Sequence, residues 1–174
     1  MLIYITGGAR SGKSRYAQDL AQRLAKRVVF VATATPSDEN LRRRIARHRR
    51  ERPKGWRTLE NPADLLTIYS TAGPRAELYL VDCLTLHVAS RLMKNEKESA
   101  ISARVETFCK KAAASPITTI LVSNEVGSGV VPPTELGIQF QDYLGRANQI
   151  AARYARHVVF LVSGLPVQIK GDPL

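Results

Sequence analysis

A phosphate-binding loop near the start of the chain constrains its fold more than any other feature. Residues 7–14 read G-G-A-R-S-G-K-S and match the pattern G-x-x-x-x-G-K-[ST]. The apolar, β-branched run 2–6 precedes the loop, and apolar residues at helical spacing follow it over residues 14–26. Because strand, loop and helix stand in the order that this motif requires, the sequence predicts an α/β fold of the P-loop NTPase class.

The loop residues indicate how a purine nucleoside triphosphate would bind. Glycines let the backbone wrap closely around phosphate oxygens, and the N-terminus of the following helix adds a partial positive charge. We expect Lys13 to reach the outer phosphates and the Ser14 hydroxyl to ligate Mg²⁺. The whole loop is therefore predicted to bind nucleotide: Gly7, Gly8, Ala9, Arg10, Ser11, Gly12, Lys13 and Ser14.

Strand-like and helix-like segments alternate along the rest of the chain. We expect strands at residues 27–33, 56–60, 78–82, 117–123, 158–162 and 166–170. We expect helices at residues 37–51, 63–71, 84–94, 99–114 and 134–156. Such alternation predicts a mostly parallel sheet with helices on both faces and an edge strand at the C-terminus. A single domain should span residues 1–174, because no linker or internal repeat interrupts the pattern.

Polar residues follow several of these strands. Ligands of parallel sheets bind beyond the carboxyl ends of the strands, so the loop should lie near residues 33–35, 82–85 and 124–127. Asp82 ends an apolar strand, where a P-loop enzyme places the acid that holds Mg²⁺ directly or through water. The alternative is that Asp82 only caps the next helix. Asn124 and Glu125 either sense the γ-phosphate or cap their own loop.

The charge of the chain favours acidic partners. It has 26 Lys and Arg against 15 Asp and Glu, a formal net charge of +11, which suits phosphorylated small molecules, nucleic acid or an anionic membrane. Much of the excess lies in residues 42–57. This segment is either a solvated helix face or part of an anion site. Only Trp56 supplies an aromatic side chain there, so the segment is poorly suited to nucleic acid.

The remaining composition indicates a cytoplasmic protein. No apolar run is long enough to span a bilayer, and the first strand leaves no room for a cleaved signal. Cys83 and Cys109 lack the spacing of metal ligands. We therefore expect both to be reduced thiols, with no disulfide between them.

His48 is the candidate catalytic residue. It shares a predicted helix face with Leu41 and Ile45, which suggests either a packing role or a place at the site. The neighbouring arginines disfavour an imidazolium and keep the ring neutral. A neutral imidazole beside a clamped phosphate is suited to covalent nucleotidyl transfer.

Taken together, these segments resemble the bifunctional adenosylcobinamide kinase / adenosylcobinamide-phosphate guanylyltransferase family of cobalamin biosynthesis. The most specific matches are R-I-x-x-H-R-x-x-R-P-x-x-W-x-T at residues 44–58 and N-E-V-G-x-G at residues 124–129. Further matching segments are 6–14, 31–34, Glu60, 122–132, 145–149 and 162–164. They cover nearly the whole chain in the right order.

The resemblance implies a RecA-like P-loop fold, a homotrimer and two Mg²⁺-dependent reactions. A nucleoside triphosphate phosphorylates the aminopropanol hydroxyl of adenosylcobinamide. GTP then donates GMP to that phosphate through a guanylylated histidine, which gives adenosylcobinamide-GDP and pyrophosphate. His48 matches the family histidine, although Arg47 stands where some members have a second histidine, and some members have Glu at the position of Asp82.

The nucleotide contacts expected beyond the loop come from the strand ends and the arginine-rich segment. They are Thr33, Ala34, Thr35, Arg49, Arg52, Glu60 and Asp82. Ser14 and Asp82 are the expected metal ligands.

Two other functions fit parts of the sequence. One is a P-loop kinase of another small molecule, in which His48 is structural. The other is a RecA-like ATPase that binds nucleic acid, suggested by the charge of +11. Against the latter, the chain is barely larger than its nucleotide fold and lacks an obvious stacking platform. The sequence therefore favours an enzyme that uses GTP, ATP and adenosylcobinamide.

Overall fold

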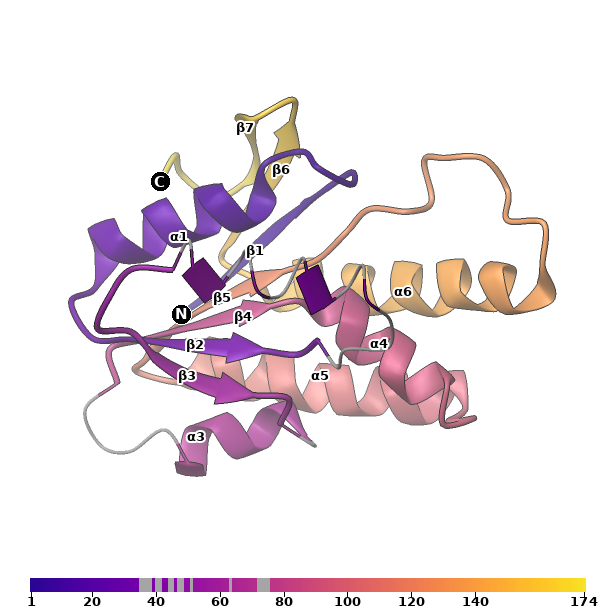
Figure 1. Cartoon of the computed structure of the whole chain (residues 1–174), viewed down its shortest axis with the longest axis horizontal. Helices are drawn as coiled ribbons and strands as arrows, with labels where there is room; N and C mark the ends of the chain where they lie inside the picture. The colour runs from indigo at the N-terminus through magenta and orange to yellow at the C-terminus, as the bar shows by residue number, and fades with distance from the viewer. Residues whose placement is uncertain are drawn as a thin grey trace.

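A mostly parallel sheet forms the centre of the molecule. The computed structural model describes residues 1–34, 39, 42–43, 46, 49–50, 52–62, 64–71 and 76–174. Across these residues seven strands follow the order β3-β2-β4-β5-β1-β6-β7 (Figure 1). The strands are β1 (Leu2–Gly7), β2 (Val28–Ala32), β3 (Arg57–Glu60), β4 (Leu78–Asp82), β5 (Thr118–Val122), β6 (His157–Val162) and β7 (Leu165–Lys170). All neighbouring pairs are parallel except β6 and β7, which are antiparallel.

Helices cover both faces of this sheet. They are α1 (Lys13–Leu24), the 3-10 turn η1 (Leu65–Thr67), α3 (Ile68–Thr71), α4 (Leu84–Leu92), α5 (Glu98–Ala114) and α6 (Glu135–Tyr154). Helix α1 lies on one face, whereas α4, α5 and α6 lie on the other (Figure 1). None of the helices in the described ranges is both long enough and apolar enough to cross a bilayer.

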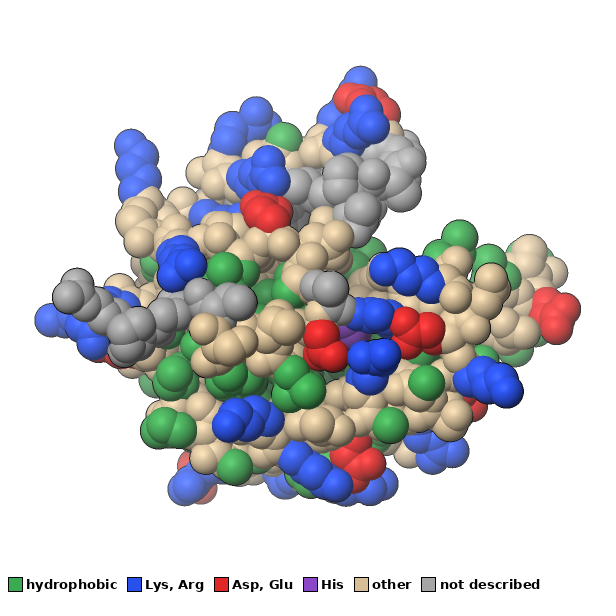
Figure 2. Space-filling model, turned by 90° about the horizontal axis from the view of Figure 1, so that it is seen from below, with side chains coloured by type: hydrophobic (Ala, Val, Ile, Leu, Met, Phe, Trp, Pro, Cys, Tyr) green, Lys and Arg blue, Asp and Glu red, His purple; other side chains and the backbone are tan. Residues whose placement is uncertain are grey.

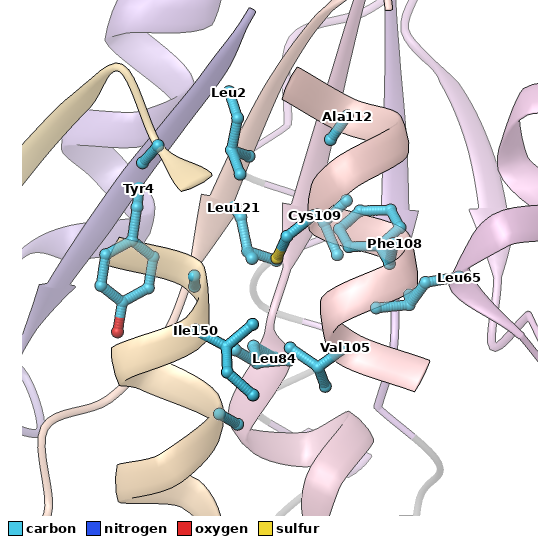
Figure 3. Packing of buried hydrophobic residues seen from close by; sticks show 14 of the residues in the cluster. Leu2, Tyr4, Leu65, Leu84, Val105, Phe108, Cys109, Ala112, Leu121 and Ile150 are labelled. Atoms are coloured by element: carbon cyan, nitrogen blue, oxygen red, sulfur yellow. The ribbon is translucent and has the colours of Figure 1, made fainter. Parts of the chain in front are cut away.

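Alternation along the strands divides the core into two layers. Ile3 and Ile5 of β1 pack with α1, whereas Leu2 and Tyr4 pack with α5 and α6. Figure 3 shows Phe108 and Cys109 of α5 in the second layer, together with Leu121 of β5. Because both faces are covered, the central strands are apolar runs rather than alternating apolar and polar residues.

The predicted fold class is confirmed, and the predicted strands agree with the structure to within one residue at either end. The expected helix at 63–71 is instead a 3-10 turn followed by one helical turn. Asp64 caps the 3-10 turn, since its carboxylate accepts the Leu66 N–H at 2.9 Å. The expected helix at 37–51 falls largely outside the described residues. The single domain over 1–174 stays a prediction. Both cysteines are free in the structure, and both are buried.

Candidate active site

A cavity lies at the carboxyl edge of the sheet on the face that α1 covers. Its volume is about 740 Å³, within the usual range for small-molecule sites. Side chains alternate along each strand, so every second residue at the strand ends turns toward α1. The strand residues of this set that line the cavity are Phe30, Ala32, Glu60, Asp82 and Val122. The loop before α1 completes the wall, from Ala9 to Ser14.

Two glycines fix the course of the phosphate-binding loop. Gly7 has φ 147°, and a Cβ there would come within 2.5 Å of the Leu161 carbonyl oxygen. Gly12 has φ 93° and is the N-cap of α1. Since side chains are disfavoured at both positive φ values, glycine is required where the loop meets β6 and where it enters α1.

Lys13 places a buried cation at this loop. Its Nζ donates to the Gly8 carbonyl oxygen at 2.5 Å and to Ser11 Oγ at 3.4 Å. Burial lowers the pKa of the Lys13 ammonium, while the charge of the nearby Asp82 opposes that shift. Both hydrogen-bond partners of Lys13 are neutral, so its positive charge stays beside the cavity and suits an anion.

The carboxyl ends of β2 and β4 are joined through Thr33. Its Oγ1 donates to the Cys83 carbonyl oxygen at 2.6 Å and accepts from the Cys83 N–H at 2.7 Å. The Thr33 hydroxyl is therefore hydrogen-bonded to the backbone of the residue that follows Asp82. Burial raises the pKa of the Cys83 thiol to about 12, so this cavity residue is a neutral thiol and not a nucleophilic thiolate.

Arg52 lies far from the loop in sequence and forms another part of the cavity wall. Its guanidinium lies 3.8 Å from the centroid of the Phe30 ring, and Nη1 donates to Thr58 Oγ1 at 3.3 Å. Glu60 Oε1 lies 3.9 Å from Arg52 Nη1 and 3.1 Å from Arg49 Nη2. The Arg52 side chain is only 9% exposed, and its Nε–H has no acceptor among the described residues. A planar cation is thus held at the wall of the cavity by Phe30, Thr58 and Glu60.

Most of the predicted nucleotide contacts come together in this cavity. Those that line it are Ala9, Arg10, Ser11, Gly12, Lys13, Ser14, Ala34, Arg52, Glu60 and Asp82. Gly7 lies against Leu161 of β6, and the Gly8 carbonyl oxygen accepts from Lys13. Arg49 pairs with Glu60, and the Thr33 hydroxyl donates to the Cys83 carbonyl oxygen. The predicted contact Thr35 and the predicted catalytic His48 lie outside the described residues. The two expected metal ligands, Ser14 and Asp82, line the same cavity.

Some cavity residues were not among the predicted contacts. On α1 they are Arg15, Gln18, Asp19 and Gln22, whose spacing along the helix places them on one polar face. The apolar floor is Phe30, Ala32, Cys83, Leu86 and Val122. Asn124, which the sequence analysis left between two roles, also lines the cavity. Alternation along the strands would have indicated Phe30 and Val122, which share a face with Ile5 and Leu80.

Comparisons with known proteins identify the fold and the family of the chain. A bacterial type III secretion system ATPase superposes with a TM-score of 0.59 at 12% identity, over 96% of this chain and 56% of that one, which supports the fold alone. The bifunctional adenosylcobalamin biosynthesis proteins CobP of Pseudomonas aeruginosa and CobU of Escherichia coli are 42% and 37% identical to the chain. Each alignment covers 98% of this chain, and they cover 98% and 100% of those proteins. The family model described as cobinamide kinase / cobinamide phosphate guanyltransferase matches residues 3–169, and the chain belongs to this family.

Proposed function

We propose that the cavity beside the phosphate-binding loop is where this cobinamide kinase and cobinamide phosphate guanylyltransferase binds its nucleoside triphosphate. The observation that carries the proposal is that Lys13, Arg52 and Asp82 line one cavity of about 740 Å³. Two cations suit the phosphates, and a carboxylate suits a metal ion bound to them. In the kinase reaction, the γ-phosphoryl group passes from ATP or GTP to the aminopropanol hydroxyl of adenosylcobinamide.

The residues present fit Mg²⁺ as the metal of this site. A hydroxyl from Ser14 and a carboxylate from Asp82 line the same cavity, and Mg²⁺ prefers oxygen ligands of these kinds together with phosphates and water. When bound, the ion neutralises charge on the phosphate oxygens. Lys13 and Arg52 share that role from the protein side and orient the triphosphate.

The guanylyl transfer is proposed to proceed through His48. An imidazole nitrogen attacks the α-phosphorus of GTP, the bond to the β-phosphate oxygen breaks, and pyrophosphate leaves. A phosphate oxygen of adenosylcobinamide phosphate then attacks the phosphorus of the adduct, which frees the histidine and forms adenosylcobinamide-GDP. Support comes from the match to the family histidine and from Arg49 and Arg52, which follow His48 in sequence and lie at the rim and the wall of the cavity.

Labelling with GTP tests this transfer. The pure protein is incubated with α-labelled GTP and Mg²⁺ without corrinoid, and label on the protein is measured. A phosphorus–nitrogen bond to imidazole is labile in mild acid and stable in alkali, so the adduct should vanish in the former and survive the latter. His48→Ala should lose the label and the GMP transfer but keep part of the kinase activity, which needs only the loop, the metal ion and the positioned hydroxyl.

Two outcomes would contradict the proposal. If His48→Ala still becomes labelled, another residue is the nucleophile. If the wild-type protein transfers GMP without ever becoming labelled, the transfer is direct.

The assembly and location of the enzyme complete the proposal. A homotrimer in the cytoplasm follows from the family resemblance, with no part for nucleic acid. The edge strand β7 exposes the apolar side chains Leu165, Val167 and Ile169, which suits contact with another protein surface. Light scattering should give three times the chain mass of 19.2 kDa, and a monomer at working concentration would contradict the trimer.

A further inference from the structure

A closed ring of hydrogen bonds surrounds the peptide of Asn124 at the end of β5. The Asn124 N–H donates to Thr85 Oγ1 at 2.7 Å, and Thr85 Oγ1 lies 3.3 Å from Ser123 Oγ. Ser123 Oγ–H donates to Asn148 Oδ1 at 2.7 Å. Asn148 Nδ2–H then donates to the Asn124 carbonyl oxygen at 2.9 Å. The ring therefore begins and ends on the two backbone polar groups of one residue.

A single arrangement of protons satisfies this ring. The Asn124 carbonyl oxygen can only accept, so Asn148 must turn its NH₂ toward it and its Oδ1 toward Ser123. Ser123 has one hydroxyl proton and donates it to Asn148. The donor between the two hydroxyls must therefore be Thr85. Each hydroxyl thus donates once and accepts once. Such a chain polarises its own members and resists rearrangement.

The ring joins three elements behind the cavity. Thr85 is in the first turn of α4, Ser123 follows β5 and Asn148 is in α6. All three side chains are buried, on the face that α4, α5 and α6 cover. Asn124 itself lines the nucleotide cavity on the opposite face, with Lys13 and Asp82. The ring therefore holds a cavity residue by its backbone without taking part in the cavity.

We propose that Asn148, through this ring, is a positioning residue that keeps the side chain of Asn124 turned toward the bound nucleoside triphosphate. The proposal rests on the proposed function of the cavity. The side chains of Thr85, Ser123 and Asn148 do not line the cavity, so loss of the ring should disturb alignment more than binding. Misplacement of a group by about 1 Å can cost on the order of 100-fold in rate. We therefore expect kcat to fall about 10- to 100-fold while KM for the nucleotide changes little.

Asn148→Asp is the sharpest test, because it keeps the shape and changes one donor into an acceptor. As a carboxylate the new group faces the Asn124 carbonyl oxygen without a proton to donate. Burial and this neighbour raise its pKa above the usual value of about 3.9. Protonation restores both bonds of the ring. The ratio of kcat between variant and wild type should therefore be low at about pH 8 and should recover as the pH falls below about 6.

Controls separate this effect from general instability and from other titrations. Tyr4 lies near Ser123 and Glu125, and His87 is in α4. All three residues are present in both proteins, so the effect of their titration cancels in the ratio of the kcat values. Burial raises the pKa of Tyr4, which keeps it neutral throughout. Asn95→Asp makes the same chemical change at an exposed turn between α4 and α5 and should leave the ratio flat. Melting temperatures at each pH exclude a loss of folded protein.

A second variant and a second readout keep the test decisive. Ser123→Ala breaks the ring without adding a charge, and it should lower kcat without recovery at acid pH. Hydrogen exchange of residues 124–127 should accelerate in both ring variants, whatever the substrate. Wild-type kcat in both, or a flat ratio for Asn148→Asp with unchanged exchange, would overturn the positioning role. Inactive wild-type protein would instead overturn the proposed function, and the exchange data would still decide whether the ring holds Asn124.

Discussion

At the carboxyl edge of the sheet, the buried polar residues of one face are charged and those around Asn124 on the other face are neutral. On the α1 face, Lys13 and Arg52 are largely buried cations, and their nearest carboxylates, Asp82 and Glu60, line the same cavity. On the face covered by α4, α5 and α6, the ring around Asn124 consists of neutral groups joined by four hydrogen bonds. Buried charge without full compensation lowers stability, whereas a satisfied neutral network does not. The residues on the α1 face are therefore suited to bind a ligand, and those on the face covered by α4, α5 and α6 are suited to hold the backbone in place.

Charges do occur on the second face, but they pair with one another. Arg91 contacts Glu96 at 2.9 Å, and Arg104 contacts both Glu96 at 3.3 Å and Asp64 at 3.2 Å. Figure 2 shows acidic and basic side chains gathered on this side of the molecule. The network links η1, α4 and α5 around the buried His87. Its cations and carboxylates contact one another at 2.9 to 3.3 Å, whereas Arg52 lies 3.9 Å from Glu60 in the cavity.

The largest effect should come from removing a cavity charge. Lys13→Ala should lower kinase turnover by about 100- to 1,000-fold, because the buried ammonium no longer meets the phosphates. The melting temperature should stay close to that of the wild type, since the ammonium stabilises a ligand and not the core. Lys26→Ala removes the same charge from an exposed site just after α1 and should be silent. Full activity of Lys13→Ala would remove the loop from the mechanism.

A smaller effect, on stability alone, should come from His87. Burial lowers its pKa to about 4, below the value of about 6.5 in an unfolded chain. Between these values the unfolded state binds more protons, so the free energy of unfolding falls as the pH is lowered. We expect a loss of about 2 kcal/mol between about pH 7.5 and pH 5.

Urea unfolding of wild type and His87→Gln at both pH values measures this loss. The carboxylates of Asp64 and Glu96 and the guanidinium groups of Arg91 and Arg104 are present in both proteins. The variant should therefore lose less stability on acidification. Equal pH dependence in the two proteins would mean that the pKa of His87 is the same in the folded and unfolded states.

The sequence was informative where a signal is local. The loop pattern, the apolar strands and the position of Asp82 at a strand end follow from neighbouring residues, and the structure has them as predicted. The ring could not be predicted, because Asn148 lies 24 residues beyond Asn124 and meets it only after α6 has packed on the sheet. Stacking of Arg52 on Phe30 likewise depends on how the chain returns after a long connection.

Thr33 belongs to one face of the sheet by its position at a strand end and to the other by the alternation of side chains. Thr33 was expected to contact the nucleotide because it follows a buried strand at the carboxyl edge of the sheet. Alternation turns its side chain to the opposite face, where Val31 packs. There its hydroxyl bonds to both backbone groups of Cys83. Thr33 should therefore act through the segment that carries Asp82 and not through the ligand.

Thr33→Val separates these two roles with the smallest expected effect. The variant keeps the shape but leaves the Cys83 N–H without its hydroxyl partner, which should cost about 1 to 2 kcal/mol in the free energy of unfolding. The Cys83 carbonyl oxygen keeps its bond from the His87 N–H at 3.3 Å, which limits the loss. KM for GTP should hardly change, and Thr33→Ser should restore most of the stability. A large rise in KM without a loss of stability would instead place the hydroxyl on the nucleotide and return Thr33 to the cavity face.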